Sequence, residues 1–228
     1  MPRAAGDSET YDFYLNADRS MPCIQLTSVT TILKKVLGAS PYLVSWAYKL
    51  GKDGVESPDE FRDRRAAEGT LAHETVERIV AGLKWPHEET GYERAWHRFV
   101  DERCPEIILS ERMVYTLKRG EGYAGTLDLG FGGVVRGRGK KLYRYDEPMI
   151  VDIKTKKASV YAAYDSELMQ CRAYAMASAD MGLVPQGCDT GILILKPNGR
   201  YSFDDRSVSD DMWLSILGTY EQMKEEGL

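Results

Sequence analysis

Long apolar runs are missing from this chain of 228 residues, and the longest are about five residues, such as Gly191 to Leu195. A bilayer-spanning helix needs roughly 20 apolar residues, so we expect no transmembrane helix. The first residues, MPRAAGDSETYDFY, are polar and acidic and lack the apolar core of a secretory signal. We therefore expect a cytoplasmic protein that does not contact membranes.

Cysteine is also sparse. The four cysteines at positions 23, 104, 171 and 188 form no Cys-x-x-Cys pair, which a zinc or iron–sulfur site usually shows. Their low density in a chain of this length also argues against a disulfide-stapled secreted protein. We expect four reduced thiols and no iron–sulfur cluster.

The charge is unevenly distributed. Composition is ordinary for a globular protein, with 43% hydrophobic and 29% charged residues, and excludes disordered and fibrous classes. The formal net charge of −5 argues mildly against a nucleic-acid partner. Residues 111–157, however, hold 11 basic and 6 acidic residues. This basic segment is either a solvated hairpin or a surface that guides a polyanion to one face.

Turn residues and hydrophobic spacing predict a mixed α/β protein. Residues 1–22 are expected to form a loose tail, and 23–228 a single domain whose N-terminal part, about 27–103, is helical. Ser57, Pro58 and Glu60 predict a capping box at the start of one of these helices. The predicted elements are helices over 27–37, 41–51, 57–81 and 90–103; strands over 107–118, 123–131 and 142–153, with a hairpin tip at 134–141; a helix over 160–181; a hairpin over 191–204; and a last helix after Ser209.

The first chemical signal is the triplet Asp152-Ile153-Lys154 at the end of a predicted strand. Side chains two apart on a strand share a face, so the carboxylate and the ammonium group lie side by side. Such a pair can hold a divalent cation and orient a water molecule. The triplet is short enough to arise by chance, and a plain strand salt bridge is the alternative.

Asp128 strengthens this signal. It follows Gly125 on the preceding predicted strand, and if the two strands are neighbours, Asp128 and Asp152 reach the same ion. Two carboxylates in contact repel each other unless a cation lies between them, and hard cations such as Mg²⁺ or Mn²⁺ favour oxygen ligands. Gly125 permits a close backbone approach. The alternative is two unrelated turn aspartates.

Three other elements carry further signals. His73 lies in a predicted helix one turn after Gly69, and a helical glycine is easier to explain if something packs close to that face. Glu111 opens a predicted strand. Three roles are open for it: a further metal ligand, a partner of Lys154, or an ordinary acid at the end of a strand. Gln170 and Tyr174 project together from a helix, one turn apart. Each of these residues taken alone is best explained by a structural role. Their combined order along the chain is the feature that indicates a function.

That order resembles the RecB-like branch of the PD-(D/E)XK nuclease superfamily, and is similar to CRISPR-associated RecB-like exonucleases and their bacteriophage relatives. The motif-bearing region covers about 68–175. The resemblance implies a restriction-endonuclease-like core, a mixed central β-sheet flanked by helices. It implies a metal site of His73, Asp128, Asp152 and the backbone carbonyl of Ile153, and a catalytic set of Asp128, Asp152, Lys154 and Glu111. Residues expected to support the site or bind DNA are Gln170, Tyr174, Arg136, Arg138, Lys140 and Lys156.

The implied activity is metal-dependent DNA exonuclease cleavage with Mg²⁺ or Mn²⁺, in the 5′ to 3′ direction, in phage or bacterial DNA replication or recombination. Many CRISPR-associated members hold an iron–sulfur cluster, and the cysteine positions here depart from that arrangement, which argues against a role in spacer processing. The partners considered are DNA, a second copy of the chain, and a single-strand annealing or recombination protein. The alternative function is a catalytically inactive DNA-binding or scaffold protein on the same fold.

Overall fold

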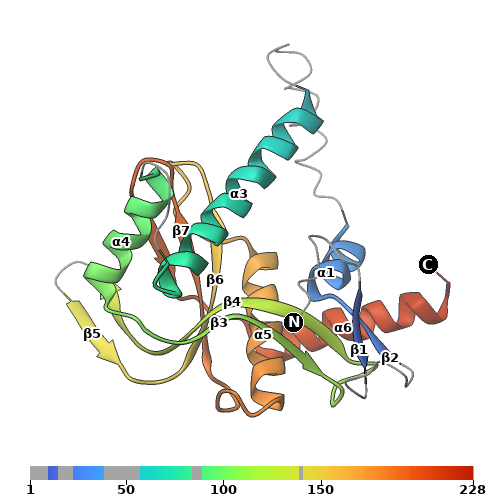
Figure 1. The fold of residues 1–228 in the computed structure, drawn as a ribbon. Helices are drawn as coiled ribbons and strands as arrows, with labels where there is room; N and C mark the ends of the chain where they lie inside the picture. Colours follow the sequence, from blue (N-terminus) through green and yellow to red (C-terminus); the bar gives the residue numbers. More distant parts are fainter. Residues whose placement is uncertain (1–9, 15–22, 39–56, 84–88, 139–140, 228) are drawn as a thin grey trace.

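The structure, a computed structural model, describes residues 10–14, 23–38, 57–83, 89–138 and 141–227 (Figure 1). A mixed central sheet has the strand order β3-β4-β6-β7-β8, and a short strand, β5, pairs with the far end of β4. The strands are β3 (Glu106–Thr116), β4 (Tyr123–Arg138), β5 (Lys141–Tyr145), β6 (Met149–Thr155), β7 (Asp189–Leu195) and β8 (Tyr201–Asp204). The described helices are α1 (Val29–Leu37), α3 (Pro58–Val80), α4 (Gly91–Arg103), α5 (Asp165–Asp180) and α6 (Asp210–Glu225).

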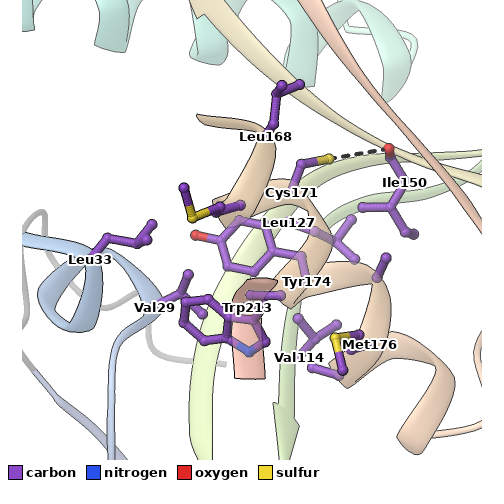
Figure 2. Close-up of a cluster of buried hydrophobic side chains, with 14 of the residues drawn as sticks. Val29, Leu33, Val114, Leu127, Ile150, Leu168, Cys171, Tyr174, Met176 and Trp213 are labelled. Atoms are coloured by element: carbon purple, nitrogen blue, oxygen red, sulfur yellow. Dashed lines mark hydrogen bonds between the residues drawn. The ribbon is translucent and has the colours of Figure 1, made fainter. Parts of the chain in front are cut away.

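Two hydrophobic cores lie on the two faces of this sheet. One core joins α1, α5 and α6 to the sheet, with Tyr174 and Trp213 among its largest side chains (Figure 2). The other joins α3 and α4 to the opposite face, through Trp96, Phe99 and Phe131. Strands β6 and β7 contribute alternate residues to the two cores, as central strands covered on both sides do. The predicted α/β class, with a mixed sheet flanked by helices, is confirmed.

The sheet is mixed because of the connections between its strands. Strands β3 and β4 pair antiparallel, as do β4 and β6, whereas β6 and β7 run parallel. Helix α5 lies between β6 and β7 in the chain, and parallel neighbours need a crossover of this kind. As a result α5 begins close to the carboxyl end of β6, where Lys154 lies.

Part of the predicted loose tail is ordered. Residues Thr10–Tyr14 form strand β1, which pairs antiparallel with β2 (Cys23–Thr27). The prediction of a loose tail over 1–22 is therefore wrong for these five residues. The strand is stabilised by backbone pairing with β2 and by a 3.4 Å hydrogen bond between the hydroxyl groups of Tyr11 and Thr126. A long-range partner of this kind leaves no local sequence pattern.

The predicted capping box at the start of α3 is confirmed. Ser57 Oγ accepts from Glu60 N–H, and the Glu60 carboxylate accepts from Ser57 N–H.

Several boundaries differ from the predictions. The segment 134–141, predicted as a hairpin tip, is mostly strand, because β4 continues to Arg138 and pairs with β5. The predicted strand over 142–153 is two strands, β5 and β6. The helix predicted over 41–51 lies outside the described residues. No helix within the described ranges is long and apolar enough to cross a membrane.

Candidate functional site

A fork between β4 and β6 positions the candidate site. The backbone pairing of these strands ends at Leu129 and Val151. Beyond this point the Asp128 carboxylate takes the place of a backbone acceptor, and the Ile153 N–H donates to Asp128 Oδ2 at 2.6 Å. The side chain of Asp128 is thereby buried and fixed at the opening of the fork. The expected neighbourhood of the two strands is confirmed.

The regular alternation of side chains between the two faces of the sheet is interrupted in strand β4 at Asp128. Residues two apart on a regular strand share a face, yet Leu127 packs in the α5-side core and Leu129 in the core under α3 and α4. On β3, Glu111 lies between Ser110 and Arg112, which pair with Leu129 and Leu127, so it lies opposite Asp128.

Glu111 has a backbone φ of 45°, in the left-handed region that a glutamate rarely adopts. Irregularities of this kind within a strand pair re-aim side chains, and strained backbone clusters at functional sites.

Helix α3 brings His73 to this irregularity. One ligand atom each from His73, Glu111 and Asp128 lie within 4.8 Å of one another. His73 Nδ1 is 3.4 Å from Asp128 Oδ1, the oxygen not used by Ile153. These residues come from a helix and two strands that are far apart in sequence. The structure thus gathers three of the predicted site residues into one compact group.

Asp152 and Lys154 form a second group beside the first, on the same strand face as predicted. Lys154 Nζ lies 2.7 Å from Asp152 Oδ2 in an ion pair. Gln170 Nε2 donates to Asp152 Oδ1 at 3.3 Å and to the Tyr174 hydroxyl at 3.0 Å. Asp152 is 2% exposed, so its charge depends on these neighbours.

The compact group overlaps only in part with the ligand set that the resemblance implied, and that set stays a prediction. The compact group contains Glu111 as a potential ligand, whereas Asp152 lies outside it and contacts Lys154 and Gln170. Asp152 Oδ2 is buried and accepts no well-directed hydrogen bond from the described residues, so lone pairs remain on this oxygen. Two or three carboxylates and one imidazole suit a hard or borderline divalent cation such as Mg²⁺ or Mn²⁺. The residues present therefore fit the expected metal.

The electrostatics of the first group favour a protonated His73 in the metal-free protein. Burial lowers the pKa of His73, but the Asp128 carboxylate and, more weakly, Asp152 outweigh burial and raise this pKa to about 9. Burial likewise raises the pKa of Asp128, yet His73, Lys154 and the Ile153 N–H together hold it below its usual value. A divalent cation bound here would compete with the His73 proton and supply the counter-charge in its place.

In the second group the two charges act in opposite directions. Burial and the repulsion from Asp128 raise the pKa of Asp152 to about 6, although Lys154 opposes this. Burial lowers the pKa of Lys154, but the carboxylates of Asp152 and Asp128 outweigh it and raise that pKa above its usual value. Lys154 is therefore a permanent cation at neutral pH. It is a charge-stabilising or hydrogen-bond-donating group rather than a proton acceptor.

Gly125 and Tyr174 are matched to each other by shape. A Cβ on Gly125 would lie 2.3 Å from Cε1 of the Tyr174 ring, which is a severe overlap. The Tyr174 ring is buried in the α5-side core (Figure 2). The predicted close approach at Gly125 is thus confirmed, and the atom that approaches belongs to Tyr174. In contrast, a Cβ on Gly69 would meet Thr155 Oγ1 at 3.7 Å, an ordinary contact. Thr155 therefore does pack close to the Gly69 face, as expected, but it leaves room for a methyl group.

Comparison with known proteins adds little to this geometry. No protein-family model matches the chain, and no curated protein matches it. Among solved structures, a match is the crystal structure of SSO0001, with 11% sequence identity and a TM-score of 0.43. The alignment covers 86% of this chain and 74% of that one. A likeness at this level carries no inference about function.

Four basic residues were also expected to bind DNA. Lys156 is buried: its Nζ donates to Glu167 Oε2 at 2.5 Å and to the Ala162 carbonyl at 3.2 Å. This ammonium group is therefore held inside the protein and is not presented to a phosphate. The side chains of Arg136 and Arg138, and the whole of Lys140, lie outside the described residues.

Much of the basic segment is neutralised within the protein. Arg119 pairs with Asp180 at 2.8 Å, and Arg144 pairs with Asp146 at 2.7 Å. Lys118 donates to the Asp180 backbone carbonyl. Of the charges described, Arg119 and Lys156 therefore have acidic partners from outside the segment. The side chains of residues 136–142 lie outside the described residues, so both interpretations, a solvated hairpin and a surface that guides a polyanion, stay open.

Two residues near the site escaped the sequence analysis. Glu167 on α5 holds Lys156, and its charge contributes to the raised pKa of Lys154. Arg65 on α3 donates to the backbone carbonyl of Thr155 at 3.2 Å and pairs with Glu68. Arg65 thereby ties the helix that carries His73 to the end of the strand that carries Lys154. An Arg-x-x-Glu pair on a helix is too common to have indicated this role.

Proposed function

We propose that this protein is a divalent-metal-dependent deoxyribonuclease, an exonuclease of the RecB-like PD-(D/E)XK kind. The observation that carries the proposal is the convergence of His73, Glu111 and Asp128 within 4.8 Å, directly beside the Asp152–Lys154 pair. Three acids, one imidazole and one lysine from four separate elements meet at one fork in the sheet. Asp128 and Asp152 are both buried, whereas Glu111 is exposed. Two buried carboxylates beside each other cost free energy, and binding of a cation would relieve that cost.

The residues divide the chemistry between them. A bound divalent cation lowers the pKa of a coordinated water and stabilises charge on the scissile phosphate. Asp128 and Glu111 would hold the cation, His73 would be its nitrogen ligand, and Asp152 would add an oxygen from the neighbouring strand. Lys154 orients the attacking water and stabilises the negative charge that develops on the phosphate. Gln170 fixes the Asp152 carboxylate from the α5 side.

The polarity and context of the reaction belong to the same proposal. The resemblance to RecB-like phage nucleases favours digestion in the 5′ to 3′ direction, in phage or bacterial DNA replication or recombination. Contacts to phosphates would be largely independent of sequence and sensitive to salt. A single-strand annealing or recombination protein, and a second copy of the chain, are the further partners that fit this role.

The test is digestion of end-labelled linear DNA, single-stranded and duplex, with Mg²⁺, Mn²⁺ or EDTA. Labels at the 5′ end and at the 3′ end give the direction, and a closed circular DNA of the same sequence separates exonuclease from endonuclease. We expect digestion of linear DNA only, and only with metal. Asp152→Asn is the inactive control. Metal-independent binding without any cleavage would instead establish the alternative, a DNA-binding or scaffold protein on this fold.

A further inference from the structure

The connection between β6 and α5, residues 156–164, presents two unusually exposed tyrosine rings beside the candidate site. Tyr161 and Tyr164 are 67% and 62% exposed, more than any other large apolar or aromatic side chain in the described residues. The connection starts two residues after Lys154 (Figure 1). The end of the connection lies near Lys154 as well: Glu167 accepts from the Tyr164 N–H at 2.8 Å, and its charge acts on the Lys154 ammonium group.

Each ring rests on a buried lysine. Lys156 Nζ lies 3.8 Å from the centroid of the Tyr164 ring, and Lys196 Nζ lies 3.6 Å from that of Tyr161. Each lysine directly follows the last residue of a strand, Lys156 after β6 and Lys196 after β7. These strand ends are adjacent, since the Lys156 N–H donates to the Leu195 carbonyl at 3.1 Å. A cation against one face of a ring attracts that face and holds it. The large exposure of both rings therefore belongs to their outer faces.

Lys196 has a particular position in this arrangement. It is 1% exposed and makes no ion pair with any carboxylate that the structure describes. The Tyr161 ring covers its ammonium group. A buried cation without a carboxylate partner is unfavourable unless something compensates it. The exposed Tyr161 ring thus also shields the charge of Lys196 from one side.

The connection is held rigidly by polar contacts. Glu167 Oε2 accepts from the Tyr164 N–H at 2.8 Å and from Lys156 Nζ. Asp204 Oδ2 accepts from the Ala163 N–H at 2.8 Å, and Arg206 donates to the Ala163 carbonyl at 2.9 Å. The rings are therefore ordered before any ligand arrives, which lowers the entropy that binding must offset.

We propose that Tyr161 and Tyr164 form a stacking platform for unpaired bases of a single DNA strand that leads to the metal site. This inference rests on the proposed nuclease function and adds its substrate form. Every nucleobase has a flat face that stacks on an aromatic ring without regard to sequence. In a duplex these faces are covered by neighbouring bases, so the platform selects a single strand or an unpaired end.

The test measures binding in EDTA, where no cleavage occurs, by fluorescence anisotropy of a labelled oligothymidylate of about 20 nucleotides. The second probe is an abasic strand of the same length, which keeps the phosphates and lacks the bases. Wild-type protein should bind the oligothymidylate at least about tenfold more tightly than the abasic strand. The double variant Tyr161→Ala/Tyr164→Ala should bind both strands equally. Tyr161→Phe/Tyr164→Phe should retain the wild-type preference, because a phenyl ring stacks as well.

Tyr143 on β5 is the matched control, since it is 60% exposed and lies outside the platform. Tyr143→Ala should keep the full preference for strands with bases. An Ala/Ala variant that keeps the preference, or a Tyr143→Ala variant that loses it, would overturn the platform. Cleavage with Mg²⁺ is measured separately on the wild type. Base-dependent binding without cleavage refutes the nuclease and keeps the platform, whereas cleavage with an unchanged preference in the Ala/Ala variant refutes the platform alone.

Discussion

The Ile153 N–H donates a 2.6 Å hydrogen bond to Asp128 Oδ2, and this bond links two neighbouring strands just beyond the point where their backbone ladder ends. A side chain thus completes the pairing of β4 with β6. The same contact orients the carboxylate, so that Oδ1 is directed to His73 at 3.4 Å. Asp128 therefore has a structural contact through Oδ2 and, under the proposed function, metal binding through Oδ1.

Substitutions of Asp128 should separate these two tasks. Asp128→Asn keeps an oxygen acceptor for Ile153 and loses the charge, so it should fold stably and bind Mn²⁺ at least about tenfold more weakly. Asp128→Ala leaves a buried N–H without a partner and should lose about 1–3 kcal/mol of unfolding free energy as well. Urea unfolding in EDTA and calorimetric titration with Mn²⁺ measure the two effects. Wild-type Mn²⁺ affinity in Asp128→Asn would remove this residue from the ligand set.

Lys154 should control the protonation of Asp152 as well as the chemical step. Its ammonium group lowers the pKa of Asp152, which burial and Asp128 raise to about 6. In Lys154→Met the pKa of Asp152 should rise further, so the carboxylate becomes charged only at higher pH. We expect cleavage at pH 7 to fall by about 100-fold or more, and the acid limb of the pH–rate profile to move to higher pH.

The control for this prediction is Lys157→Met, which changes an exposed lysine of the neighbouring connection. It should leave the acid limb in place. A Lys154→Met variant with reduced cleavage and an unmoved acid limb would show that the lysine acts on the phosphate alone, and not through Asp152.

Metal affinity should depend on pH through His73. Because the neighbouring carboxylates raise the pKa of His73 to about 9, a proton competes with the cation throughout the neutral range. The ordinary histidine pKa of 6.5 would place this competition below neutrality. We expect Mn²⁺ affinity to fall about tenfold per unit as the pH drops from 9 to 7. Below pH 6 protonation of Asp152 should add a second loss.

His73→Ala should bind Mn²⁺ more weakly and lose most of the dependence between pH 7 and 9. His97→Ala serves as the control, since His97 lies on α4 and faces Glu93 at 3.8 Å, outside the site. Calorimetric titration at pH 7, 8 and 9 on the three proteins separates the cases. Parallel pH dependence in the wild type and His73→Ala would show that His73 does not bind the metal.

Part of the candidate site's arrangement could be predicted from the sequence, because simple spacing rules determine it. Asp152 and Lys154 share a strand face by alternation, and Gln170, one helical turn from Tyr174, reaches Asp152 from α5. The features of the site that could not be predicted depend on contacts between residues far apart in the sequence. The left-handed backbone of Glu111 and the fork at Asp128 come from the way β3, β4 and β6 pair. No local pattern indicates either of them.

The basic segment, residues 111–157, is a second case in which the sequence does not reveal long-range contacts. A count of charges along 111–157 indicates an excess of positive charge, but it does not reveal which charges are paired. Arg119 with Asp180, and Lys156 with Glu167, are matched to acids outside the segment. Net charge read along the chain therefore overstates the field that this face presents.

Two glycines give the last prediction, because their surroundings differ while the substitution is the same. Gly125→Ala places a methyl group 2.3 Å from the Tyr174 ring, which is packed in the core and has no room to move. It should reduce the unfolding free energy by about 1–3 kcal/mol. Gly69→Ala adds a methyl group in ordinary contact, 3.7 Å from Thr155 Oγ1, inside a helix. It should raise the unfolding free energy by about 1 kcal/mol, since alanine favours the helix.

Urea unfolding of both variants in EDTA checks the opposite signs. A third variant, Gly125→Ala/Tyr174→Ala, removes the ring that the new methyl group meets. If the overlap is the cause, Gly125→Ala should cost much less in the Tyr174→Ala background than in the wild type, a strong departure from additivity. An equal cost in both backgrounds would mean that Gly125 is required by its backbone geometry, and that Tyr174 is not the residue that excludes a side chain there.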